Sequence, residues 1–335
     1  MLATGTAQRD PLPRLPAALA GACGGENVKG ASFYGGQAVI EGVMMRGRTA
    51  MAIGLRRPDG GVLVHEEAMW PWTQRFPAFG RPFIRGVVAL VEALLIGIRA
   101  LNFSAEQLAE GEGEKLGAKE LAASFAVAVA AAAGLFVVLP AFVIRLVEGW
   151  IPSNVLLNMV EGLIKIGLFT AYILAIGRVP DIRRVFQYHG AEHKAINCYE
   201  AGMPLTVDNV ERQSIVHIRC GTNFILIVLF MSVFVFSFFG RPPFGQRVVL
   251  HLVLLPVVAG LSYEIIRLAA RENALVPLRW IATPGLWMQR LTTRQPDRSQ
   301  IEVAIAALER VLVRDGALLP GGRARRRGAR ASYVR

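Results

Sequence analysis

Four long apolar segments constrain this chain more than any other feature of its sequence. Each holds close to the roughly 20 apolar residues that a helix needs to cross about 30 Å of hydrocarbon. Of all residues 53% are hydrophobic and only 19% are charged, which argues against an ordinary soluble enzyme and against a disordered protein. The pattern predicts a polytopic α-helical membrane protein with about four transmembrane helices. The predicted spans cover residues 121–144, 155–176, 222–239 and 248–268.

The charged loops predict how these spans are oriented. The connection after the second span is rich in arginine and lysine, whereas the loop between the first two spans has almost no positive charge. Because cytoplasmic loops carry the excess of Lys and Arg, we expect residues 177–221 and both termini to be cytoplasmic. The net charge is +12, and half of it lies in the arginine-rich C-terminal tail. The charge therefore indicates orientation and contact with membrane lipid, and no nucleic-acid partner.

The chain before the first span predicts a small sheet and an interfacial helix. Residues 29–85 contain short apolar runs on either side of a Pro-Asp-Gly-Gly turn, which predicts a β-rich cytosolic segment with a hairpin. Residues 86–103 are apolar, but their uncharged stretches are too short to cross a membrane. We expect them to form an amphipathic helix at the membrane interface.

The chain ends are expected to contribute little to the fold, apart from one helix. Residues 1–28 are rich in Ala, Pro and Gly and predict a flexible leader, and residues 321–335 predict a disordered basic tail. Residues 269–320 predict a cytosolic C-terminal region, with aromatic or Pro-rich turns over 277–294. Helical spacing over 299–313 places apolar side chains on one stripe, which is typical of a helix packed on a domain.

The cytoplasmic connection 177–221 carries the strongest chemical signal. Pro180 and Gly202 predict the start and end of a helix, and between them lie His189, Glu192 and His193 in an H-x-x-E-H arrangement. At about 100° per residue these three side chains share one face, which continues the apolar stripe of the helix. Buried imidazoles and carboxylates need partners, and a divalent cation is an effective one. The motif therefore predicts a metal site.

A metal ion needs ligands beyond this helix. Candidates on the same side of the membrane are His217, Cys220 and Glu264. Glu200 and Cys198 lie further along the helix and fit supporting positions better than ligand positions. His251 belongs to the fourth span and lies roughly 20 Å from Glu264 along it, so we do not expect it to be a ligand. Zinc fits a mixed set of nitrogen, sulfur and oxygen donors best, with manganese or iron as alternatives.

Two other groups of residues are candidates for function. Glu161 and Lys165 lie on one face of the second span, and intramembrane charges often mark a pathway. We interpret them as a neutralised pair that holds helices together. The glycine-rich segment 35–47 lacks the Gly-Lys-Ser/Thr ending of a phosphate loop and favours tight turns in a small sheet. Its Glu41 or Arg46 could contact substrate or support the metal site.

Several motifs of this chain are long and specific. They are the glycine-rich segment 35–47, Phe-Gln-Tyr-His-Gly-Ala-Glu-His-Lys at 186–194, Asn-Cys-Tyr-Glu at 197–200, Arg-Cys-Gly-Thr at 219–222 and Leu-Thr-Thr-Arg-Gln-Pro-Asp at 291–297. Through them the chain resembles the YqhQ-like family of uncharacterised bacterial membrane proteins. The resemblance implies the bacterial inner membrane and a metal-dependent enzyme, and it implies no substrate. One departure is Ile218, where we expect proline in the family, and it loosens the turn that presents His217 and Cys220.

Two functional hypotheses follow. The first is an integral membrane metal-dependent hydrolase in which Glu192 accepts a proton from a metal-activated water. Its substrate would be a peptide or a lipid-like molecule at the cytosolic membrane face. The second is a noncatalytic membrane scaffold in which a structural metal stabilises a surface for partner proteins. The two differ at Glu192, because a catalytic base is needed for turnover but not for the fold. The sequence predicts no oligomeric state.

Overall fold

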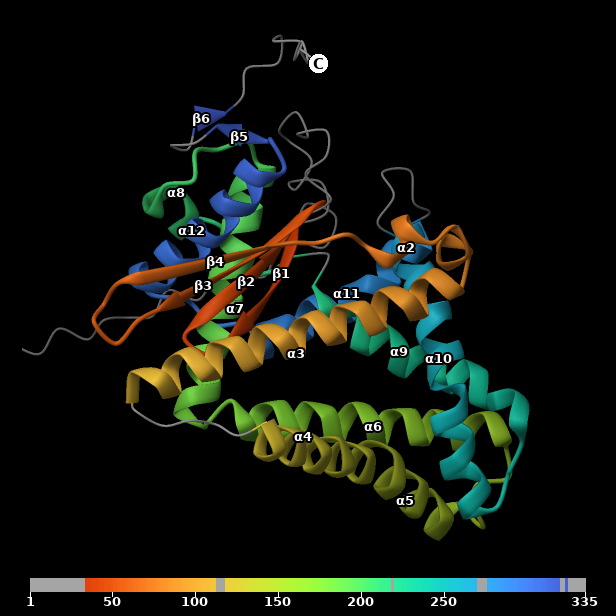
Figure 1. Ribbon diagram of the computed structural model, residues 1–335. Coiled ribbons are helices and arrows are strands. Elements are labelled where there is room, and N and C mark those ends of the chain that lie inside the picture. The colour runs from red at the N-terminus through yellow and green to blue at the C-terminus, as the bar shows by residue number, and fades with distance from the viewer. Residues whose placement is uncertain (1–33, 113–117, 218–219, 270–275, 320–322, 325–335) are drawn as a thin grey trace, which may run out of the picture.

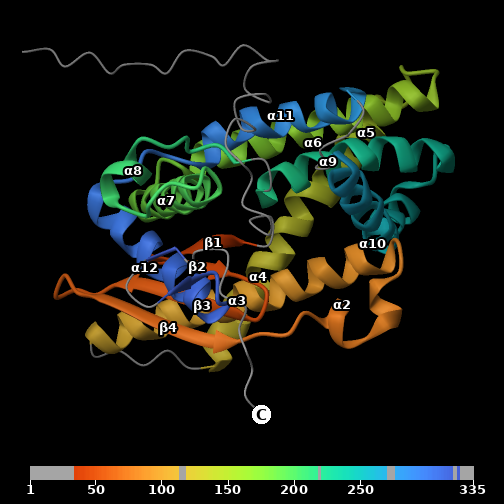
Figure 2. The same ribbon diagram turned by 90° about the horizontal axis from the view of Figure 1, so that it is seen from above.

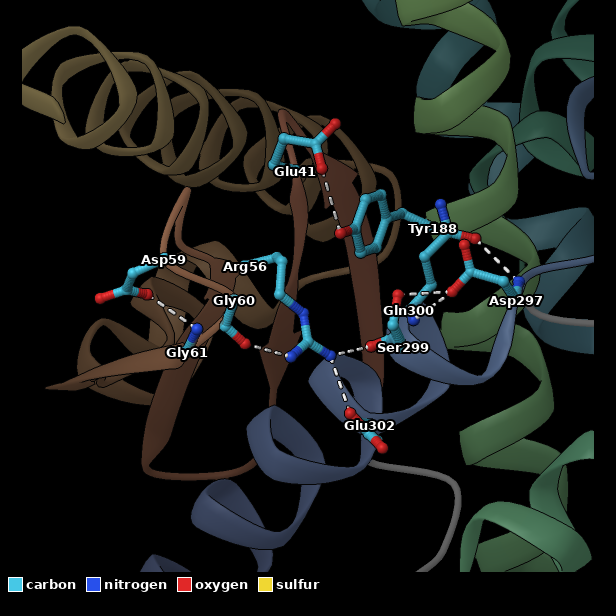
Figure 3. Close-up of polar contacts among 10 residues, drawn as sticks. All are labelled: Glu41, Arg56, Asp59, Gly60, Gly61, Tyr188, Asp297, Ser299, Gln300 and Glu302. Carbon is cyan, nitrogen blue, oxygen red and sulfur yellow. Dashed lines mark hydrogen bonds and ion pairs between the residues drawn. The ribbon is translucent and has the colours of Figure 1, made fainter. Parts of the chain in front are cut away.

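A four-stranded antiparallel sheet forms the N-terminal part of the fold (Figure 1). The strands neighbour one another in sequence order, and the predicted hairpin is confirmed as the last two of them. In its turn Gly60 has a φ of 84° and the Asp59 carboxylate accepts a hydrogen bond from the Gly61 N–H (Figure 3). The strands are β1 (Gly35–Val39), β2 (Gly42–Arg46), β3 (Ala50–Arg56) and β4 (Val62–Ala68).

Helices cover both faces of this sheet. On β2, Val43 and Met45 enter a core shared with α7 (Pro180–Glu200) and α12 (Arg298–Arg314). Met44, between them, enters the opposite core with α3 (Ile84–Glu112). Successive side chains of a strand point to opposite faces, so a strand covered on both faces reads as a continuous apolar run. Figures 1 and 2 show the resulting layers, with the sheet between α3 and the pair α7 and α12.

Helix α3 is longer than the interfacial helix predicted for residues 86–103. Ile96 and Ala100 are buried against the sheet, whereas Leu90 and Leu94 on other sides of the helix are exposed. The helix therefore packs on the sheet with one face and keeps an apolar surface on another.

Helix α12 begins at a capping box and packs along the sheet. The Asp297 carboxylate accepts a hydrogen bond from the Gln300 N–H, and the Gln300 side chain accepts one from the Asp297 N–H. From β3, Arg56 donates to the Ser299 carbonyl and pairs with Glu302, which ties the sheet to the first turn of the helix (Figure 3). The predicted apolar stripe of this helix is buried, as expected.

Among the described residues, four helices are long and apolar enough to cross a membrane. They begin and end within a few residues of the predicted spans. They cover Ala123–Val147, Asn154–Ile176, Gly221–Phe239 and Phe244–Ala269. The elements that form them are α4 (Ala118–Ala133), η4 (Gly134–Val138), α5 (Leu139–Val147), α6 (Asn154–Ile176), α9 (Gly221–Phe236), η5 (Ser237–Phe239) and α10 (Phe244–Ala269).

The first and last of these helices depart from a simple bundle. Pro140 lies just after the π-helical turn η4, where the wider spacing accommodates a residue without an N–H, so the helix continues through it. In Figure 1 α10 crosses the direction of α6 at a steep angle. Near its end Gly260 lies against α3, where a Cβ at Gly86 would stand 3.2 Å from the Gly260 Cα.

The turns predicted over 277–294 were wrong, because this segment forms α11 (Val276–Thr292). Pro277 lies in the first turn, where a missing N–H has no intrahelical partner to lose, and Pro284 is carried inside the helix. After the helix, the chain turns beside α7, where the Arg294 N–H donates to the Phe186 carbonyl at 2.9 Å.

Three short helices and a two-stranded ribbon complete the fold. They are α2 (Trp72–Arg75), η3 (Pro77–Gly80) and α8 (Val207–Glu211), with β5 (Leu318–Leu319) paired to β6 (Arg323–Ala324). The computed structural model describes residues 34–112, 118–217, 220–269, 276–319 and 323–324. The predicted leader, 1–28, lies outside the described residues. So does the predicted tail, 321–335, except for β6, which is paired where disorder was expected.

Candidate metal centre

Helix α7 places the H-x-x-E-H residues beside the core that it shares with the sheet and α12. Its limits match the prediction, since Pro180 is the first residue and Gly202, with a φ of 69°, follows the end. Glu192 and His193 are 5% and 1% exposed, so both point into the protein. His189 is partly buried on the same side of the helix.

His189, His193 and Cys220 form a cluster whose potential donor atoms all lie within 4.8 Å of one another. The His189 Nε2 lies 3.2 Å from the Cys220 Sγ, and His193 is also in hydrogen-bond contact with that thiol. The two imidazole centroids are 4.4 Å apart. The structure thus joins the two predicted histidines to one of the three predicted ligands outside the helix.

The backbone determines which nitrogen of each histidine is free to bind. The Nδ1 of His189 is 2.9 Å from the Thr292 carbonyl oxygen, and the Nδ1 of His193 is 2.6 Å from that of Ile215. A carbonyl oxygen only accepts, so each Nδ1 must carry the proton and donate it. Each Nε2 then presents a lone pair towards Cys220. Metal-binding histidines are commonly oriented in this way, with the second nitrogen donating to a carbonyl or carboxylate.

Cys220 is the N-cap residue of α9. Its Sγ accepts a hydrogen bond from the Thr222 N–H and lies 3.1 Å from the Thr222 hydroxyl. The Sγ thus lies at the N-terminal end of α9, beside the Thr222 N–H and hydroxyl. One S–H proton could satisfy only one of the two facing Nε2 lone pairs.

The donor set fits a divalent metal. Two nitrogens and one sulfur match zinc, and Zn–N and Zn–S bonds of about 2.0 and 2.3 Å place tetrahedral ligands about 3.5 Å apart. The 3.2 Å between the His189 Nε2 and the Cys220 Sγ is close to that spacing. Three protein ligands leave one coordination position for water or substrate.

Glu192 lies beside this cluster, at the edge of the sheet. The Gly36 N–H of β1 donates to its carboxylate, and a Cβ at Gly36 would stand 3.0 Å from the Glu192 Cγ. Glycine therefore lets the strand approach the carboxyl. Burial raises the pKa of Glu192, and His189, His217 and the Gly36 N–H offset part of this rise. A raised pKa makes the carboxylate a stronger proton acceptor than an exposed one.

His217 is a neighbour of the cluster rather than a member. Its ring centroid is 5.7 Å from that of His193, and its Nε2 is 3.3 Å from a carboxylate oxygen of Glu200. Burial lowers the pKa of His217 to about 4, which Glu192 partly opposes, so the ring is neutral and donates to Glu200. Glu200 thus contacts His217, which lies outside the cluster.

Gln289 of α11 holds the backbone of His217. Its side-chain oxygen accepts from the His217 N–H at 2.9 Å, and its side-chain nitrogen donates to the His217 carbonyl at 2.8 Å. Gln289 is fully buried, so no water replaces it. These two hydrogen bonds hold the backbone at His217, three residues before Cys220.

Replacing Gln289 by alanine is therefore expected to lower the free energy of unfolding by about 2–4 kcal/mol, because two buried backbone groups would lose their partners. Denaturant titration of the full chain in detergent measures this. The exposed Gln295→Ala serves as the control and should change stability little. Equal effects of the two substitutions would contradict this role of Gln289.

The structure does not bring two other predicted residues to the cluster. The Glu264 carboxylate is bound by Arg85 of α3, with the Arg85 Nε at 2.7 Å, and the Phe83 N–H also donates to it. Cys198 points into the core, where its thiol faces the carbonyls of Met203 and Pro204, and burial raises its pKa to about 11. Neither side chain is placed to share an ion with the histidines.

Glu41 and Arg46 serve other contacts. Glu41 lies in the turn between β1 and β2 with a φ of 52°, forms an ion pair with Arg184 and accepts a hydrogen bond from the Tyr188 hydroxyl (Figure 3). Arg46 pairs with Glu92 of α3 at 2.9 Å. These contacts join the sheet to α7 and to α3, so they stabilise the scaffold around the cluster.

Sequence reasoning missed the groups that orient the cluster. The carbonyls of Thr292 and Ile215, the Gln289 side chain and the Gly36 N–H all act from segments distant from α7. Backbone groups carry no residue-type signal. Two of these groups lie in segments that the sequence marked as specific, Gly36 in the glycine-rich segment 35–47 and Thr292 in the motif at 291–297.

Comparison with known proteins places the chain among proteins without an assigned activity. The family model described as a protein of unknown function (DUF1385) matches residues 81–314. The chain is 37% identical over 292 residues to the uncharacterized protein YqhQ of Bacillus subtilis (strain 168), which covers 83% of this chain and 92% of that protein. No solved structure matches it. The family resemblance is confirmed, whereas the metal-dependent enzyme implied by it receives no support from these relatives.

Proposed function

The chain belongs to the DUF1385 family of proteins of unknown function, and we propose from its own geometry that it is a membrane metal-dependent hydrolase. The observation that carries the proposal is the pair of Nε2 lone pairs. Both histidines donate Nδ1–H to a carbonyl, so both Nε2 atoms face the Cys220 thiol without enough protons to satisfy them. A divalent ion, with zinc preferred over manganese or iron, satisfies all three donors at once.

In this proposal Glu192 is the general base. A divalent ion held by His189, His193 and Cys220 would supply Lewis acidity for the attack of water on an electrophilic carbonyl or phosphoryl group. Glu192 takes the proton of the attacking water and passes it to the leaving group. Its burial and its Gly36 N–H contact hold the carboxyl beside the cluster, and its raised pKa makes the returned proton available.

One observation favours the second candidate function, a scaffold with a structural metal. His193 and Glu192 are 1% and 5% exposed, and structural metal sites are closed whereas catalytic sites keep an open position. In that case the ion would join α7 to the start of α9 and stabilise a surface for partner proteins. Both candidate functions include the metal, but only the hydrolase needs Glu192 as a base.

We further propose the setting of this site. The four apolar helices would cross the bacterial inner membrane, and the excess of Lys and Arg in the connection between α6 and α9 favours cytoplasmic termini and a cytoplasmic metal centre. The substrate would then be a peptide or lipid-like molecule at the membrane face. Reporter fusions that place residues 177–217 outside the cytoplasm would contradict this orientation.

Elemental analysis of the purified full chain tests the metal. We expect about one zinc per chain in the wild type and its loss in His193→Gln and Cys220→Ala, because each removes a ligand. Even changes to groups that only orient a metal ligand typically cost about 10–100-fold in metal affinity. The exposed His65→Gln is the matched control and should retain the metal. A folded, metal-free wild type would overturn the proposal.

A further inference from the structure

Helix α3 carries an apolar face that the described residues leave exposed. Six of its large apolar side chains are between 37% and 56% exposed. At about 100° per residue they lie within an arc of about 140°, and between residues 84 and 101 that arc holds no charged side chain. Soluble proteins rarely expose apolar surfaces of this extent, so the face indicates a partner. The six side chains are Ile84, Leu90, Val91, Leu94, Leu95 and Leu101.

The charged residues in this part of α3 lie outside the arc. Arg85 binds the Glu264 carboxylate with its Nε at 2.7 Å, and Glu92, only 5% exposed, pairs with Arg46 of β2 at 2.9 Å. On a helix at the surface of a soluble domain, the charges would face water and the apolar side chains would face the core. Here two of the three charges, all but Arg99, are turned towards the protein, and a leucine-rich face is turned away from it.

An aromatic segment precedes α3 and lies against it. The Trp72 N–H of α2 donates to the Glu92 Oε1 at 3.1 Å, which fixes this segment beside the helix. Four of its aromatic side chains are between 38% and 66% exposed. Aromatic side chains, Trp and Tyr above all, are enriched where a membrane meets water. The four are Trp70, Trp72, Phe76 and Phe83.

The exposed charges around this surface are all positive. Arg75, Arg81 and Arg99 are exposed, whereas the one acidic residue between positions 69 and 101 is the buried Glu92. Anionic lipids attract arginines placed in this way. A second copy of the chain docked through the same face would bring the same cations together, because a two-fold interface pairs identical patches. The charges therefore favour a lipid surface over a dimer.

The contact between α3 and α10 indicates how deep this face lies in a membrane. Figure 1 shows the start of α3 beside α10, and a Cβ at Gly86 would stand 3.2 Å from the Gly260 Cα. Gly260 lies nine residues before the end of α10, which has 26 residues and a length of about 39 Å. Centred on about 30 Å of hydrocarbon, this helix places Gly260 about 9–10 Å inside the nearer boundary. Interfacial amphipathic helices bury their apolar faces to about 5–10 Å, so the start of α3 lies at their depth.

We propose that α3 and the aromatic segment before it dock into an anionic phospholipid leaflet on the side of the sheet. The exposed leucines lie among the acyl chains, and Arg75, Arg81 and Arg99 reach the headgroup phosphates. The proposal rests on the membrane setting proposed above. Because the sheet packs on the other side of α3, the docked helix holds the sheet, and the core that α7 shares with it, against the membrane.

Thiol labelling of the full chain, held singly in nanodiscs of phosphatidylglycerol and phosphatidylcholine, tests the docking. In Leu94→Cys we expect a water-soluble maleimide to react at least about tenfold more slowly than in Val62→Cys, because the thiolate is the reactive form and apolar surroundings suppress it. Mass spectrometry assigns each label to its residue, so the native cysteines do not interfere. Exposure in the protein alone predicts the opposite order, since Leu94 is 56% exposed and Val62, at the start of β4, is 38% exposed.

Val253→Cys separates this proposal from the membrane setting on which it rests. Val253 is 65% exposed on α10, and we expect the thiol to be protected because that helix crosses the membrane. A protected Val253→Cys together with a rapidly labelled Leu94→Cys would overturn the docking alone. Rapid labelling of Val253→Cys would overturn the membrane setting and the docking with it.

Photo-crosslinking identifies what covers the face. Phosphatidylglycerol with a diazirine in its acyl chain should label residues 84–101, and phosphatidylcholine with the same group should label them less. Protection of Leu94→Cys without lipid cross-links would show another occupant, a second copy or a protein partner, and would overturn the proposal. Equal labelling by the two lipids would overturn the choice of an anionic leaflet.

A triple substitution tests the arginines. Replacing Arg75, Arg81 and Arg99 together by glutamine should remove the difference between the two lipids. The matched control replaces three arginines of α12 whose side chains are between 54% and 57% exposed, and it should keep the difference. An unchanged lipid preference in the first variant would contradict the role of its arginines. The control positions are Arg298, Arg310 and Arg314.

Discussion

Replacing Glu192 by glutamine is expected to leave the metal bound and to lower hydrolysis by about 10²–10⁴-fold, the usual contribution of a positioned acid–base group. Glutamine keeps the shape of the side chain but cannot take a proton. Glu192 is not among the residues whose donor atoms converge, so the ligands stay in place. The pattern of retained metal and lost turnover would distinguish a base from a ligand.

The measurement pairs elemental analysis with turnover of model peptide, ester and phosphoester substrates by the full chain. Glu309→Gln is the matched control, because it removes a partly buried carboxylate on α12 that has no contact with the cluster. We expect the control to keep both metal and activity. A Glu192→Gln protein with full turnover would refute the role of the base, and a wild type that binds metal but hydrolyses none of the substrates would favour the scaffold.

The second large effect is expected at Gly190. In α7 a Cβ at this position would stand 2.0 Å from the Arg294 carbonyl oxygen and 3.4 Å from Pro296. Gly190→Ala must therefore push α7 away from the segment after α11. Overpacking usually costs about 1–3 kcal/mol, and a clash with a backbone atom puts this substitution at the upper end or above. The same shift would disturb the contact between His189 and Thr292, so metal affinity should fall too.

Gly167 provides a control for the Gly190→Ala prediction. Gly167 lies inside α6, and no heavy atom stands within 4 Å of a Cβ added there. Helix propensity alone favours alanine over glycine by up to about 1 kcal/mol, so Gly167→Ala should be neutral or stabilising. Thermal or denaturant unfolding of the two variants should therefore give effects of opposite sign. Similar effects would show that the close approach at Gly190 does not limit stability.

Local patterns in the sequence were sufficient for several elements. Apolar runs predicted the four candidate spans, the stripe over 299–313 predicted α12, and the alternation around Pro-Asp-Gly-Gly predicted the hairpin. The spacing of His189, Glu192 and His193 on one buried face was also visible. These features depend on the period of a helix or strand, which the order of residues specifies directly.

Contacts between residues distant in the sequence could not be predicted from these local patterns. Glu264 was expected near the histidines because it lies at the correct end of its helix, but Arg85 of α3 binds it. His251 was set aside as too distant from the metal, and it proves to face Glu161. The turns expected over 277–294 are a helix, since Pro277 lies in the first turn and packing against α9 outweighs the internal Pro284.

The chain order thus specified which faces are apolar and which residue types lie on them. The packing of α7, α9, α11 and the sheet decided which faces meet. Of the three candidate ligands outside α7, it brought only Cys220 into the cluster with the two histidines. It also supplied the carbonyls of Thr292 and Ile215 that orient both imidazoles. The physical reason is that a periodic pattern specifies direction around one element, whereas a site needs several elements at bonding distance, and that distance is a property of the whole packed core.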